Sequence, residues 1–94
     1  MTYVTISHWT ISEWNDAMEA TARETFIPMI MAAGASSTRM VRTGGQTMSV
    51  VTEYDTAGKA ATAQARIAEI RAKATKDLPM TLVSASGGDV FASN

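Results

Sequence analysis

The sequence has no cysteine and a single histidine, His8, among its 94 residues. Without cysteine there are no disulfides, no thiolate nucleophiles and no metal sites built on sulfur. This absence fits a reducing cytoplasm, which is the expected location. A zinc site needs three or four ligands, so one histidine without cysteine argues against it. We therefore expect neither a metal nor a cofactor.

Long apolar runs and clusters of one charge are lacking too. The longest apolar stretch, around Phe26–Ala35, is about half of the roughly 18 residues that a membrane span needs. The N-terminus shows no signal-peptide pattern. The net charge is −1, and the eight Lys and Arg residues are scattered. Binding phosphates requires a basic stripe, so we expect neither a nucleic acid nor a membrane as partner.

The centre of the chain carries a strong hairpin signal. Strand-like runs at Ser36–Thr43 and Gln46–Tyr54 flank Gly44-Gly45. A glycine pair favours a tight turn because glycine accepts the positive φ that such turns require. A helical pattern lies on each side of this hairpin, and one more strand lies outside each helix.

The first strand is expected at Tyr3–Trp9, where the side chains alternate between two faces. One face is expected to pack against the helices because it carries Val4 and Ile6, together with His8. The opposite face would then expose two large aromatic residues, Tyr3 and Trp9.

The first helix is expected from Glu13 to about Ala33, with Ser12 as its N-cap and Gly34 as the residue that ends it. Pro28 removes a backbone donor, so a kink or break is expected near it.

The second helix is expected from Ala57 to about Ala74, capped by Asp55-Thr56. Its apolar stripe consists of Ala60, Ala63, Ile67, Ile70 and Ala74. The last main strand is Met80–Ser86. Gly87-Gly88 is expected to interrupt it, and Asp89–Ala92 to form a short extra strand or an arm.

This order favours an α+β fold for residues 1–94 as a single domain. It is a ferredoxin-like βαββαβ sandwich, with a four-stranded antiparallel sheet and two helices on one face. The first and third strands are expected at the centre of the sheet, parallel to each other. Aromatic side chains on the bare sheet face would be covered most simply by a second copy, so we expect a homodimer.

The chain resembles the dimeric α+β barrel superfamily, which contains the antibiotic-biosynthesis monooxygenases and many small stand-alone domains. The resemblance covers nearly the full length. It rests on the element order, on Phe26–Ala35 leading into the second strand, and on the ending Gly88-Asp89-Val90-Phe91-Ala92-Ser93. It implies two sheets facing each other across a dimer. Members include cofactor-free oxygenases and haem-degrading enzymes, so the fold alone implies no particular activity. The haem-degrading members ligate iron through a histidine on the second helix, and none is present here.

Candidate catalytic residues are His8, Glu53 and Tyr54, which the expected parallel pairing would bring together. His8 would act as a base, since only a histidine has an unperturbed pKa near neutrality. Glu53 would act as an acid or orienting group, and Tyr54 would supply a phenol. These groups suit proton abstraction from a phenol or enol, but a lone histidine at a strand end is more often structural.

Candidate ligand-binding residues are Trp14, Met18 and Phe26 on the apolar side of the first helix, where the alternative is an ordinary core role. Arg39 and Arg42 lie three apart on a strand, so they are expected on opposite faces. One of them could hold an anionic substrate, although arginine on an edge strand more often discourages edge-to-edge pairing.

Two functions remain open. The first is a non-catalytic dimeric domain that binds a small apolar or aromatic molecule between sheet and helices. The alternative is a cofactor-independent, monooxygenase-like enzyme that uses His8 as its base.

Overall fold

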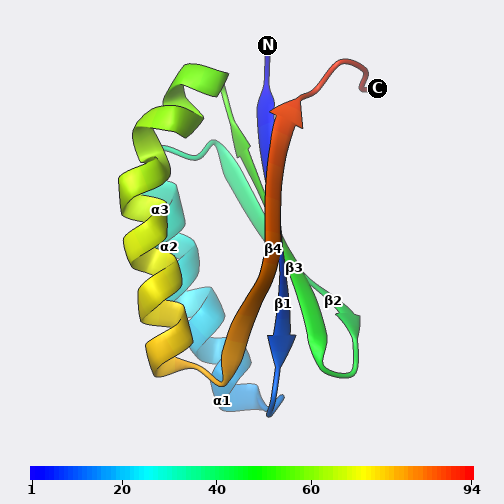
Figure 1. Cartoon of the computed structure of the whole chain (residues 1–94), viewed down its shortest axis with the longest axis vertical. Coiled ribbons are helices and arrows are strands. Elements are labelled where there is room, and N and C mark those ends of the chain that lie inside the picture. The colour runs from blue at the N-terminus through cyan, green and yellow to red at the C-terminus, as the bar shows by residue number, and fades with distance from the viewer.

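The computed structural model describes residues 1–94 as a single layer of helices on a single sheet (Figure 1). Eight elements follow one another along the chain: β1 (Tyr3–Ile11), α1 (Asp16–Thr21), the π-helical turn η1 (Ala22–Phe26), α2 (Ile27–Ala32), β2 (Ser37–Gly44), β3 (Thr47–Tyr54), α3 (Ala57–Asp77) and β4 (Met80–Asp89). No helix combines the length and the apolarity that a membrane crossing requires.

The sheet has the strand order β2-β3-β1-β4, and every neighbouring pair is antiparallel. Figure 1 shows the α1–η1–α2 helix and α3 side by side on one face of this sheet, while the other face is bare. The expected ferredoxin-like α+β fold is therefore confirmed.

The expected parallel pairing of the two central strands is wrong. Tyr3 pairs with Tyr54 and Thr10 pairs with Thr47, so β1 and β3 are antiparallel. The helical crossover leaves β2 parallel to β1, and the tight hairpin then reverses the chain into β3. As a consequence, the end of β1 meets the beginning of β3, and the end of β3 meets Tyr3.

The expected orientation of β1 is also wrong. Trp9 is 4% exposed and Ile11 is 1% exposed, whereas His8 is exposed on the opposite face. The strand continues to Ile11, two residues beyond the expected end. The helix-facing side therefore gains Trp9 and Ile11, which bury more apolar area than Val4 and Ile6 do.

The first helix begins later than expected. The cap is Asn15, not Ser12, and its Oδ1 accepts a hydrogen bond from the Met18 backbone N–H at 2.8 Å. Where Pro28 was expected to cause a kink or break, the helix widens into the π-helical turn η1 just before it. Gly34 follows the helix with a φ of 117°, a conformation that favours glycine.

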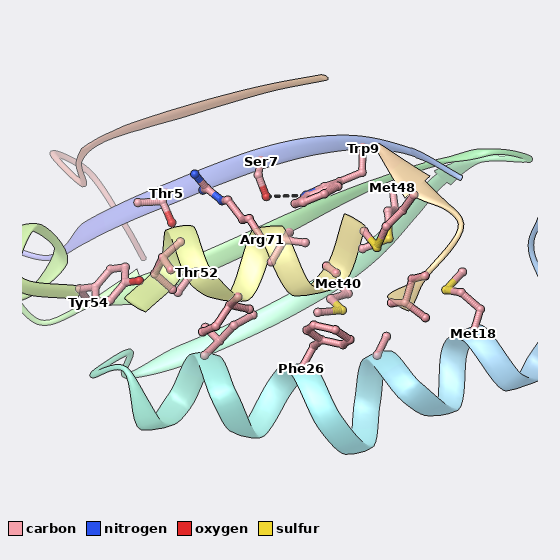
Figure 2. Close-up of a pocket in the computed structure, with 18 residues that line it drawn as sticks. Thr5, Ser7, Trp9, Met18, Phe26, Met40, Met48, Thr52, Tyr54 and Arg71 are labelled. Carbon is pink, nitrogen blue, oxygen red and sulfur yellow. Dashed lines mark hydrogen bonds between the residues drawn. The ribbon is translucent and has the colours of Figure 1, made fainter. Parts of the chain in front are cut away.

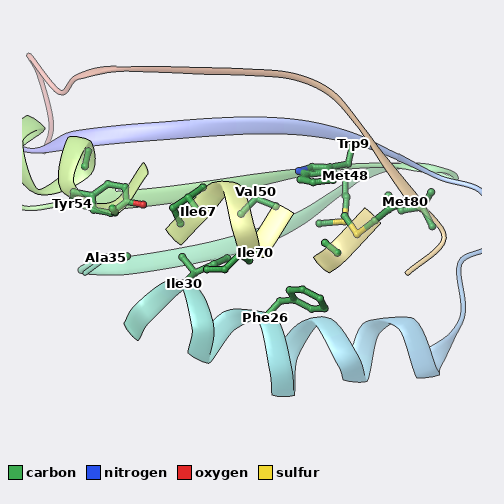
Figure 3. Packing of buried hydrophobic residues seen from close by; sticks show 14 of the residues in the cluster. Trp9, Phe26, Ile30, Ala35, Met48, Val50, Tyr54, Ile67, Ile70 and Met80 are labelled. Atoms are coloured by element: carbon green, nitrogen blue, oxygen red, sulfur yellow. The ribbon is translucent and has the colours of Figure 1, made fainter. Parts of the chain in front are cut away.

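The second helix agrees closely with its expected pattern. Thr56 caps α3 by accepting a hydrogen bond from the Lys59 backbone N–H. The buried residues of α3 are the expected stripe Ala60, Ala63, Ile67, Ile70 and Ala74. Figure 3 shows Ile67 and Ile70 meeting Val50 of the sheet, with Ile30 and Phe26 closing the core from the other helix.

Both expected turn regions differ in detail. The hairpin turn is Gly45-Gln46 rather than Gly44-Gly45, and neither glycine has a positive φ. A Cβ at Gly44 would lie 2.6 Å from Thr47 Oγ1, so a larger residue there would require the Thr47 side chain to move. At the other end, Gly87-Gly88 does not interrupt β4, which pairs with β1 as far as Asp89.

Candidate functional site

A small cavity lies between the sheet and both helices, surrounded mainly by apolar side chains (Figure 2). We call it the inner cavity. Its volume is about 50 Å³, room for a few water molecules. One end is formed by Met18, Phe26, Met40 and Met48, with Trp9 above them. Methionine side chains are flexible, so this end can change shape at low cost.

The opposite end of the inner cavity is polar. Its lining includes the hydroxyl-bearing residues Thr5, Ser7, Thr52 and Tyr54. Figure 2 shows Arg71 reaching from α3 toward Ser7 and Thr5 of β1. Ser7 accepts a 2.8 Å hydrogen bond from the Trp9 indole. The cavity is therefore amphipathic along its length.

Tyr54 is 1% exposed at this polar end. Burial raises the pKa of its phenol above the ordinary value, and the positive charge of Arg71 partly offsets that rise. The phenol is therefore neutral near pH 7.

A larger groove opens beside the inner cavity, between the first helix and edge strand β2. This outer groove has a volume of about 410 Å³, and Met18, Ala22, Met40 and Met48 line both hollows. The methionine side chains therefore stand between a solvent-accessible groove and the interior.

Trp14 and Arg42 form a wall of the outer groove. The Arg42 guanidinium carbon lies 4.2 Å from the centre of the Trp14 ring, a cation–π contact. The guanidinium also donates to the carbonyl oxygens of Gly44 at 3.1 Å and Gly45 at 2.9 Å. The Trp14 indole donates to Glu19 Oε2 at 2.6 Å. These bonds hold an aromatic and a cationic surface in a fixed orientation.

The structure brings together the three expected ligand-binding residues. Met18 and Phe26 line the inner cavity, and Trp14 and Met18 line the outer groove. No observation tests whether they contact a ligand, so that role stays a prediction. Arg39 and Arg42 lie on opposite faces as expected: Arg42 pairs with buried Met48, and Arg39 pairs with Val51 on the bare face.

The three expected catalytic residues do not converge, because β1 and β3 are antiparallel. His8 lies on the bare face with its Nδ1 2.8 Å from Ser49 Oγ. Glu53 is on the same face but four residues farther along β3, roughly 13 Å away at the usual rise per residue. Tyr54 is on the helix side. The expected cluster is wrong, while a catalytic role for any one of them stays a prediction.

Sequence reasoning missed Met40, Met48 and Arg71 as lining residues. The alternation of β2 and β3 could have placed the two methionines on the face of Val50. Arg71 directly follows Ile70 of the stripe, so a position beside the sheet could have been inferred from helical spacing. No three or more His, Asp or Glu side chains are gathered where they could hold a metal ion.

No known family profile and no curated protein matches this sequence. Solved structures share its fold at low identity. MupZ from Pseudomonas fluorescens has a TM-score of 0.71 at 16% identity, over 92% of this chain and 69% of that one. A dimeric ferredoxin-like protein from an uncultured marine organism has a TM-score of 0.71 at 15% identity, over 100% and 98%.

A candidate antibiotic biosynthesis monooxygenase from Nitrosomonas europaea has a TM-score of 0.59 at 20% identity, over 93% of this chain and 89% of that one. The chain therefore shares a ferredoxin-like α+β fold with these proteins. The resemblance noted in the sequence is thus confirmed for the fold. At these identities the likeness extends no further than that.

Proposed function

We propose that this protein binds a small apolar or aromatic molecule between the first helix and the sheet. The observation that supports it is the contact of two hollows across Met18, Met40 and Met48. An aromatic ring can enter the outer groove against Trp14, and movement of the methionine side chains then extends the space toward Phe26. Such sites are typically apolar with a few oriented polar groups.

Calorimetric titration with indole, a small neutral aromatic, tests this proposal. Ala22 lines both hollows, so Ala22→Leu fills their junction and should abolish the binding heat. Ala17→Leu adds the same volume at an exposed position of the same helix and should bind as the original protein does. Equal binding by both variants, or no binding by the original chain, would refute the site.

A homodimer is the second part of this proposal. The bare sheet face carries a central apolar patch made of Val4, Ile6, Val41 and Val51, where Ile6 pairs with Val51 across the two central strands. One protein with this fold is itself described as dimeric. Covering the patch with a second copy removes apolar surface from water.

Light scattering on the intact chain tests the dimer. The Ile6→Asp change places a charge in the middle of the apolar patch and should yield a folded monomer. Thr81→Asp adds the same charge on the face's outer strand and should leave the dimer intact. A monomeric original protein would contradict this part while leaving ligand binding to be judged separately.

Binding is favoured over catalysis because His8 lies on the face opposite both hollows. A monooxygenase-like reaction with His8 as base would therefore need its substrate on the bare sheet face. His8→Asn should leave indole binding unchanged, because His8 lines neither hollow. Loss of binding in a folded His8→Asn protein would instead tie His8 to the ligand.

A further inference from the structure

A second groove lies on the other side of the molecule, between α3 and edge strand β4. Its volume is about 440 Å³. Half of its ten lining residues are very small, with Ala57, Ala60 and Ala61 on α3 and Ala85 and Gly87 on β4. We call this groove the slot; methyl groups and backbone contribute to both of its sides.

One cation stands in this slot. Arg71 is half-buried and lines both the slot and the polar end of the inner cavity. The two ion pairs of the chain, Lys59–Asp55 and Lys73–Asp77, do not involve it, and no side-chain acceptor bonds its guanidinium. Its N–H donors are therefore free to bind an anion that enters the slot.

The other polar groups of the slot are neutral. They are Tyr3, Thr5, Gln64 and Ser86, and no carboxylate or second cation lines the slot. The one acid of β4, Asp89, is not among the lining residues, although it pairs with Tyr3 at the end of the strand. The local charge is therefore a single positive one, which matches a monoanion better than a phosphate dianion.

Gly87 determines where the Tyr3 hydroxyl lies. A Cβ at position 87 would be 2.6 Å from Tyr3 Oη and 2.9 Å from Cε1. Glycine thus lets the phenol ring lie directly across β4, with its hydroxyl in the same slot as Arg71. The slot therefore offers one guanidinium and one phenol hydroxyl beside the alanine side chains of α3.

We propose that the slot between α3 and β4 binds a short-chain monocarboxylate. Arg71 holds the carboxylate through the paired N–H donors of its guanidinium, whose planar geometry matches two carboxylate oxygens. The hydrocarbon body lies between the alanines of α3 and Gly87. This site is separate from the outer groove beside β2, so it does not depend on the binding function proposed above.

Hexanoate is the probe, and backbone amide shifts in the intact chain are the readout. Saturable shifts are expected at Ala60, Ala61 and Gly87. Hexanol has the same chain without the charge and should produce none of them at equal concentration. Inorganic phosphate should produce weaker shifts than hexanoate. Equal effects of hexanol, or of phosphate, would overturn the assignment of a monocarboxylate.

Arg71→Gln should weaken hexanoate at least about tenfold, since hydrogen bonds to a charged group are worth about 1.5–3 kcal/mol. Arg71→Lys keeps the positive charge but loses the paired N–H donors of the guanidinium. Its affinity for hexanoate should lie between that of the original protein and that of Arg71→Gln. Arg66→Gln removes a charge from the exposed side of the same helix and should change nothing. Unchanged affinity in both folded Arg71 variants would overturn the proposal.

A separate variant leaves Arg71 in place. Gly87→Ala forces the Tyr3 ring to move and narrows the slot, so hexanoate should bind more weakly while the amide spectrum remains that of a folded protein. Unchanged hexanoate affinity in Gly87→Ala would place the acid outside the slot and contradict the proposal, whatever the Arg71 variants show.

Discussion

The indole nitrogen of Trp9 donates a hydrogen bond to Ser7 Oγ at 2.8 Å, and both side chains are buried. The two residues are neighbours on the same face of β1, two positions apart. This bond makes it possible to bury the polar edge of the indole without loss. It helps to explain why β1 turns the face carrying Trp9 toward the helices.

Removing the acceptor should therefore destabilise the protein. Ser7→Ala leaves the buried Trp9 N–H without a partner, at an expected cost of about 1–3 kcal/mol in the free energy of unfolding. Urea denaturation measures it. Ser84→Ala, on an exposed position of β4, should cost far less. A Ser7→Ala protein as stable as the Ser84→Ala protein would show that the indole finds another acceptor.

Gly34 provides a test of the helix end. Its φ of 117° is strained for any residue with a Cβ, although no atom lies within 4 Å of the position a Cβ would take. Gly34→Ala should therefore destabilise by backbone strain alone, on the order of 1–3 kcal/mol. Gly45→Ala is the matched control, because Gly45 also has free space but no positive φ. The midpoint temperature of thermal unfolding of the Gly34→Ala protein should be well below that of the Gly45→Ala protein. Equal midpoints would contradict the claim that the backbone at Gly34 is strained for other residues.

How far the fold could be predicted depends on what each pattern encodes. The stripe Ala60–Ala74 was predicted in full because the 3.6-residue period on a long helix permits only one buried face. The face of β1 that packs against the helices was predicted wrongly, because an alternation with a period of two fits either face equally well. Only the continuation to Ile11 and the bond from Trp9 to Ser7 decide between them.

The residues of the candidate site were also predicted only in part. Met18 and Phe26 were predicted from the helical stripe and do line the inner cavity. Glu53 and Tyr54 were wrongly grouped with His8, because the direction of β3 was assigned incorrectly. Arg71 was overlooked because a charged helix residue is usually solvated, although its place directly after Ile70 puts it at the edge of the buried stripe.

Tyr54 should make the protein sensitive to alkali. Burial raises its pKa in the fold, so above the ordinary value near 10 the unfolded chain loses this proton first. The stabilising contribution is complete below that pH and is lost as the pH rises through the pKa of the folded state. Tyr54→Phe should flatten the alkaline fall in unfolding free energy. An equally steep fall in Tyr54→Phe would assign it to another group.

Arg71 should be detectable through the same phenol. Its positive charge lowers the pKa of Tyr54, so Arg71→Gln should raise that pKa further. Ultraviolet titration of the phenolate measures the shift, and a Tyr3→Phe background removes the other tyrosine signal. A fall in the pKa of Tyr54 on removing Arg71 would place the guanidinium outside the polar end of the cavity.

The measurement that tests the central claim most directly is a titration with indole, observed through carbon-13-labelled methionine methyl groups. Met18, Met40 and Met48 line both hollows, whereas Met1 is 76% exposed and Met31 is 39% exposed, and both lie outside them. Saturable shifts at Met18, Met40 and Met48, without shifts at Met1 and Met31, are the predicted result. Shifts at Met1 and Met31 alone, or none at all, would contradict binding between the first helix and the sheet.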